Sequence, residues 1–192
     1  MKWLLDPYLW MIVIIIFFIV ATLIFKLDYI NIDRIIKNHI GNFKNTNGKI
    51  PIMIWILYFI CPFILAVSLG NIEQIGEDII SNITVMLSII TAMLFTLIPM
   101  MMDLKSKISN NVSNNASRRS DLIQLTKEVF DSIMFEIIIS IFILLIIFIS
   151  SFSNMYNILV SILIYYLIFV FLLNLMIVLK RFYIIFKELM NN

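Results

Sequence analysis

Long, uninterrupted apolar runs dominate this sequence and leave it few ways to fold. A helix that crosses the hydrocarbon core of a membrane needs about 17–25 apolar residues. Five runs approach or reach that length, at about residues 9–25, 51–69, 83–102, 133–150 and 156–179. None contains Lys, Arg or Asp, and Glu136 alone brings a carboxyl group inside. Because every backbone N–H and C=O group in lipid must find a partner within the protein, we expect five transmembrane helices.

The composition supports a membrane protein over a soluble one. Apolar residues make up 62% of the 192 residues, whereas soluble domains average about 45–50%. A soluble domain of this size could not bury so much apolar surface. The sequence therefore predicts an all-α integral membrane protein with one membrane domain over residues 1–192 and connections at 26–50 and 103–132. The net charge of +2 is too small to indicate direct binding of nucleic acid.

The basic residues predict the orientation of the chain. Lys and Arg near the ends of spans tend to remain cytoplasmic. Of the 14 lysines and arginines, all but Lys2 fall in the first connection with its flank, the third connection or the carboxyl-terminal tail. We therefore expect the amino terminus outside, the carboxyl terminus in the cytoplasm, and the protein in a bacterial cytoplasmic (inner) membrane with multiple passes.

A polar strip, SNNVSNNASRRSD at residues 109–121, interrupts the apolar sequence. Asn and Ser side chains bond to nearby backbone and favour turns, so we expect a cytoplasmic linker. A helix capped at Ser120 or Asp121 should follow and continue into the fourth span. A second short helix is expected within NIDRIIKNHIGN, residues 31–42, lying on the inner leaflet with His39 at its surface.

Small and hydroxyl side chains recur every four residues along the third span. Residues four apart share one face of a helix, and such faces let membrane helices approach closely. Two interpretations remain open: packing within one subunit, or the lining of a wet path or subunit contact. The residues concerned are Thr84, Ser88, Thr91, Ala92 and Thr96.

Four other residues within the spans stand out. Pro62 and Pro99 each remove a backbone hydrogen bond and should kink the second and third spans. Asn174 is an amide well inside the fifth span and needs a partner, which we expect on another helix. Glu136 lies near the cytoplasmic end of the fourth span, where it could pair with a basic residue of the adjoining connection.

The sequence lacks the parts of an enzyme. It contains no G-x-S-x-G, no H-E-x-x-H and no Gly-rich phosphate loop, and it has only 4 glycines. Met86, Met93 and Met100 repeat every seven residues, but no His or Cys accompanies them in a copper-binding pattern. We therefore expect no enzymatic activity, no cofactor and no metal.

Two segments resemble small multi-pass membrane proteins of bacterial anti-phage defence cassettes. They are LSIITAMLFTLIPMMMDLKSKI, residues 87–108, and RRSDLIQLTKEVFDSIMFEIIISIFILLIIFI, residues 118–149. The resemblance implies a membrane protein that works with a cytosolic sensor or nuclease and either anchors it or perturbs the membrane. Residues 103–131 would then form the contact surface for that partner.

The expected function is that of a non-enzymatic membrane subunit or effector of a defence or stress system. It would be homo-oligomeric, surrounded by the lipid bilayer, and would couple a cytosolic protein to membrane anchoring or ion permeation. The third connection would meet the partner through Lys105, Lys107, Arg118 and Arg119. The alternative is a small transporter or channel component, or a membrane protein of the bacteriocin-immunity type, which would need no cytosolic partner.

Overall fold

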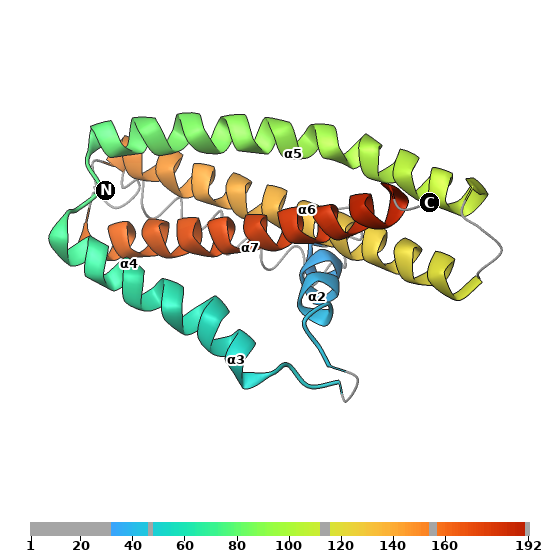
Figure 1. The fold of residues 1–192 in the computed structure, drawn as a ribbon. Coiled ribbons are helices and arrows are strands. Elements are labelled where there is room, and N and C mark those ends of the chain that lie inside the picture. Colours follow the sequence, from blue (N-terminus) through green and yellow to red (C-terminus); the bar gives the residue numbers. More distant parts are fainter. Residues whose placement is uncertain (1–31, 46–47, 112–115, 154–156, 191–192) are drawn as a thin grey trace, which may run out of the picture. The chain divides into compact units, whose positions relative to one another are not determined.

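The computed structural model describes residues 32–45, 48–111, 116–153 and 157–190, which form helices and no strands (Figure 1). The chain divides into two compact units, Met1–Asn38 and His39–Asn192. In the first unit, the beginning of the first described helix carries an exposed ion pair between Lys37 and Asp33. In chain order the described elements are α2 (Asp33–Gly41), α3 (Ile52–Trp55), the π-helical turn η3 (Ile56–Ile60), α4 (Cys61–Ile72), α5 (Glu77–Asn111), α6 (Ala116–Ser153) and α7 (Ile158–Met190).

Four of the described helical segments are long and apolar enough to cross a membrane. They are Ile52–Ile72, Glu77–Ser109, Ser117–Ser151 and Ile158–Met190. They contain most of the second to fifth expected spans, so the prediction of helices long and apolar enough to cross a membrane is confirmed for these four segments, and the described residues are helical as expected. The first expected span, 9–25, lies outside the described residues.

The polar strip is more helical than the sequence indicates. Helix α5 continues to Asn111, and α6 already begins at Ala116. The prediction that residues 109–121 form a linker is therefore wrong for most of the strip, as is the expected helix start at Ser120 or Asp121. One local contribution is that the Ser120 hydroxyl donates to the Ser117 carbonyl of the same helix. This serine therefore bonds to nearby backbone without leaving the helical conformation. The prediction that this helix continues into the fourth span is confirmed.

Within the second unit, the long helices pack in the order α5, α6, α7 and α4 (Figure 1). Helix α5 buries Leu87, Leu94 and Met101. Helix α6 contributes an isoleucine row to the same core, and α7 adds Phe171. Many apolar side chains on the outer faces remain exposed, as lipid-facing side chains should.

The connection between α4 and α5 is attached to the first turns of α7. The Ile75 backbone N–H donates to the Ser161 hydroxyl at 3.1 Å, and the Tyr165 hydroxyl donates to the Glu73 carbonyl at 3.3 Å. At the start of α5, Glu77 and Asp78 lie in the first turn, where negative charge complements the helix dipole. These bonds fix the side of α7 on which the chain turns.

The two prolines affect their helices differently. Pro62 stands in the first turn of α4, directly after the π-helical turn η3. The expected distortion at Pro62 thus takes the form of a π turn, which accommodates a residue without an N–H group. Pro99 lies inside α5, whose helical assignment continues without a break from Glu77 to Asn111. The kink expected at Pro99 stays a prediction within this continuous helix.

A close approach between α4 and α7 occurs at Gly70. Both Ala66 and Gly70 are buried on α4. A Cβ atom built on Gly70 would lie 2.6 Å from Ile162 Cγ1 and 3.6 Å from Ile162 Cα. Only a residue without a side chain fits here unless the Ile162 side chain moves, as expected for small residues at a membrane helix contact.

We predict that Gly70→Ala destabilises the contact between α4 and α7. Overpacking of this kind costs about 1–3 kcal/mol, which exceeds the roughly 1 kcal/mol that Ala gains over Gly in a helix. The measurement is the free energy of unfolding in mixed micelles. Gly41→Ala is the control, because a Cβ atom at Gly41 meets nothing within 4 Å. Equal stability of the two variants would contradict the packing described for Gly70.

Candidate functional site

A line of polar side chains runs along the contact between α6 and α7. Glu128, Ser132 and Glu136 are spaced by four residues and share one face of α6. Opposite them, α7 presents Arg181 and Asn174. Burying a polar group inside a helical membrane bundle costs free energy, so such groups usually serve binding, transport or helix packing. This line is therefore the candidate functional site.

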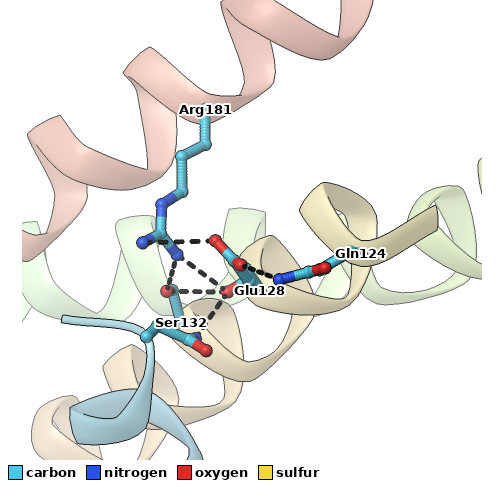
Figure 2. A network of polar contacts seen from close by, with 5 residues as sticks. Gln124, Glu128, Ser132 and Arg181 are labelled. Carbon is cyan, nitrogen blue, oxygen red and sulfur yellow. Dashed lines mark hydrogen bonds and ion pairs between the residues drawn. The ribbon is translucent and has the colours of Figure 1, made fainter. Parts of the chain in front are cut away.

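The outer part of the line is an ion-pair network. Figure 2 shows the Arg181 guanidinium reaching from α7 to Glu128 and Ser132 on α6. Arg181 Nη2 lies 3.5 Å from Glu128 Oε2, and Nη1 donates to the Glu128 carbonyl and to the Ser132 hydroxyl, each at 3.4 Å. Gln124 Nε2 donates to Glu128 Oε1 at 3.2 Å. The side chains of Arg181 and Glu128 are only 14% and 22% exposed, so this pair is largely shielded from water.

The inner part of the line is an unpaired carboxyl group. Glu136 is 0% exposed, and neither of its carboxyl oxygens has a hydrogen-bond partner. Asn174, also fully buried, donates through Nδ2 to the Ser132 carbonyl at 3.5 Å, while its Oδ1 has no partner. The amide lies next to the Glu136 carboxyl group without meeting the geometry of a hydrogen bond. The expected inter-helix bond of Asn174 is present. The expected pairing of Glu136 with a basic residue is absent.

His39, at the beginning of the second unit, packs against α6 beside Glu136, through Phe135. It is 1% exposed, so the expectation that it lies at a surface is wrong. Its ring stacks on Phe135 with centroids 4.0 Å apart, and its Nε2 lies 3.4 Å from the Tyr58 hydroxyl. Burial, and to a smaller extent the positive charge of Arg181, lowers the pKa of His39 to about 4. The imidazole is thus neutral at neutral pH.

The cluster brings together an imidazole, a phenol, carboxyl groups and a guanidinium group. Tyr58 is within electrostatic range of both Glu136 and Arg181. The described residues hold no group of three His, Cys, Asp or Glu that could bind a metal ion. What the arrangement offers is a buried carboxyl and amide that could hold a proton, a water molecule or a small cation.

The small and hydroxyl side chains that recur along α5 lie on two faces of the helix, one packed and one exposed. Thr91 is buried, and its hydroxyl donates to the Leu87 carbonyl of its own helix at 2.6 Å. Thr84 is half-buried, whereas Ser88, Ala92 and Thr96 are exposed. The described part of the chain therefore does not pack against the last three.

The basic residues of the third connection are mostly engaged within the chain. Lys107 pairs with Asp103 at 2.8 Å, and Arg118 pairs with Glu188 at 2.6 Å. Arg119 donates to the Ser109 hydroxyl at 3.1 Å. Lys105 has no ion-pair partner among the described residues. These contacts join α6 to the end of α7 and to the end of α5.

The sequence analysis missed Arg181, Glu128 and Ser132 as parts of one site. The signal was present in the four-residue spacing of Glu128, Ser132 and Glu136. It was hidden because the expected fourth span began at residue 133, which placed the first two in a connection. Arg181 was counted only as a cytoplasmic charge.

No family model matches this chain, and neither a curated protein nor a solved structure is significantly similar to it.

We predict that the protein loses stability as the pH falls below about 6.5, because of His39. Its folded pKa of about 4 lies below the unfolded value of 6.5. The stabilisation is therefore complete above the unfolded pKa and is lost as the pH falls toward the folded pKa. Between about pH 7.5 and pH 5 the loss should be about 2 kcal/mol in the free energy of unfolding. His39→Gln should remove this component, and an unchanged pH dependence in that variant would contradict the assignment.

We also predict that Glu136 carries a proton at neutral pH. An ionised carboxylate buried without a partner is strongly disfavoured, and a proton could supply the donor that Asn174 Oδ1 lacks. The infrared spectrum at neutral pH should show a carboxylic acid C=O band that disappears in Glu136→Gln. Glu128→Gln is the control. Because Glu128 forms an ion pair with Arg181, its replacement should leave the band unchanged. A spectrum without the band, or a band insensitive to Glu136→Gln, would show that Glu136 is ionised.

Proposed function

We propose that the protein is a non-enzymatic subunit or effector of a bacterial defence or stress system that acts by assembling with further copies of itself in the cytoplasmic membrane. In this proposal the chain has five spans, with the amino terminus outside and the carboxyl terminus in the cytoplasm. The assembly then changes the permeability of the membrane or anchors a cytosolic partner there.

The exposed face of α5 carries this proposal. Ser88, Ala92 and Thr96 point away from the packed side of α5, which holds Leu87 and Leu94. A helix facing only lipid gains little from small side chains, whereas two helices that meet through them can approach closely and share hydrogen bonds. The proposed occupant of this face is α5 of a second copy.

The cytoplasmic ends of the helices support a contact with a protein partner. Lys107 is exposed, and Arg118 and Glu188 are each about half exposed in their ion pair. Such exposed pairs contribute little to stability, about 0–1 kcal/mol, so an acidic partner surface could exchange with them at low cost. The proposed contact surface is residues 103–131.

A second candidate is a small transporter or channel component, and the Glu136 site favours it. An ionisable residue inside a membrane bundle most often marks a path for protons, ions or substrate. In this case the individual subunit would act, and neither assembly through α5 nor a cytosolic partner would be needed.

We predict that copies cross-link through Ala92. In a Cys61→Ala background, which removes the single cysteine, Ala92→Cys should form a disulfide-linked dimer under mild oxidation in membranes. The control is Phe142→Cys, on the exposed side of α6 at 53% exposure, which should remain monomeric. The combination Ser88→Leu and Thr96→Leu should reduce cross-linking about tenfold, corresponding to a loss of about 1.4 kcal/mol of association. It should also abolish depolarisation of the host membrane on induced expression, whereas Ile141→Leu with Phe142→Leu should not.

Two results would reject the proposal. Equal cross-linking at Ala92 and Phe142 would mean that α5 has no preferred contact. Depolarisation that survives the Ser88 and Thr96 substitutions but disappears in Glu136→Gln would favour the transporter or channel component.

A further inference from the structure

A cavity lies between α5 and α6 near the ends of their apolar segments, on a different face of α6 from Glu128 and Ser132. It has a volume of about 320 Å³, which falls in the range of about 300–1,000 Å³ found for ligand pockets. Its lining combines apolar side chains with two lysines, and it consists of Met101, Met102, Lys105, Thr126, Lys127 and Phe130.

The two ammonium groups are the donors that this cavity offers a ligand. Lys105 and Lys127 are exposed, and neither has an ion-pair partner among the described residues. The nearby carboxylates Asp103 and Glu128 are paired with Lys107 and Arg181 instead. The Thr126 hydroxyl is occupied, because it donates to the Leu122 carbonyl at 2.8 Å. The cavity therefore presents two ammonium groups without an ion-pair partner among the described residues and no free neutral donor.

The apolar lining determines which anion fits. Met101 is buried and Phe130 is half-buried, while Met102 is 66% exposed on the side that faces lipid. Lys105 follows the apolar run of α5 by one turn, and Lys127 precedes that of α6 by less than two turns, so both ammonium groups lie at headgroup depth. Met and Phe next to them can receive the beginning of an acyl chain.

We propose that this cavity binds the phosphate group of an anionic phospholipid through Lys105 and Lys127, with the lipid's apolar part against Met102 and Phe130. Basic pockets between membrane helices bind anionic headgroups in this manner. The site does not depend on a role in defence or on assembly through α5. A bound lipid would contact both the carboxyl-terminal part of α5 and the amino-terminal part of α6.

The test measures lipid binding to the full chain in detergent by native mass spectrometry. The probes are phosphatidylglycerol, which is anionic, and phosphatidylcholine, which has no net charge. Phosphatidylglycerol should bind more tightly, and Lys105→Gln with Lys127→Gln should weaken its binding about twenty-five-fold, because each lysine near a headgroup contributes about a factor of five. The control with the same loss of charge is Lys180→Gln with Lys187→Gln, because both lysines are exposed and neither lines the cavity; the affinity of this variant should remain unchanged.

Further variants separate a lipid from a free anion. Lys105→Arg with Lys127→Arg should retain binding, and Met102→Ser should weaken it without any change of charge. Equal affinity for the two lipids, or an equal loss in both double Gln variants, would overturn the proposal, because binding would then follow general surface charge or apolar contact. Displacement of phosphatidylglycerol by millimolar inorganic phosphate, with Met102→Ser unaffected, would also overturn it and identify an ion site.

Discussion

The contact between Arg181 of α7 and the Glu128–Ser132 face of α6 sets the register of the two helices. A guanidinium group has a fixed donor geometry, so a rotation or a one-turn slide of α7 would separate it from Glu128 and bring apolar side chains against the polar face of α6. The net stabilisation from such a shielded pair is modest, because desolvation offsets much of the attraction. Its effect on specificity is larger: alternative registers would leave Arg181 and Asn174 without partners inside the bundle.

The register of α7 has consequences for the other helices. With α7 fixed against α6, Ile162 faces Gly70, and the absence of a side chain there lets α4 approach closely. Ser161 and Tyr165, on the same turns of α7, hold the connection that leads into α5. Helix α5 then returns to pack on α6 through Leu87 and Leu94. Polar contacts thus fix the register of α7 near its carboxyl-terminal end, and close packing of Ile162 on Gly70 adds to this near its amino-terminal end.

The sequence predicted the helical class and four of the apolar segments that could cross a membrane, because both follow from hydrophobicity over many residues. It failed where one side chain's partner lies far along the chain. His39 looked like a surface residue within a short amphipathic helix, and nothing local indicated that Phe135 would stack on it. Polar composition suggested a linker at residues 109–121, yet helix propagation from both sides extends into it. Glu136 was recognised, but its lack of a partner depends on Arg181 bonding to Glu128, a choice that only tertiary packing decides.

The polar line between α6 and α7 ends inside the protein, and this limits how the chain could conduct ions. Exposure falls from Gln124, which is exposed, to Glu136, which is fully buried. The next polar residue on that face, Ser140, is buried, and its hydroxyl donates to the Ile137 carbonyl at 2.8 Å. Beyond it the same face continues with Ile143 and Ile147, both buried in the apolar core. Among the described residues, therefore, a proton entering from the Gln124 end could reach Glu136 but would find no polar side chain on α6 between Ser140 and Ser150, a rise of about 15 Å. Permeation through this contact would require α6 and α7 to separate, whereas permeation between copies would use the outer face of α5 and leave the contact intact.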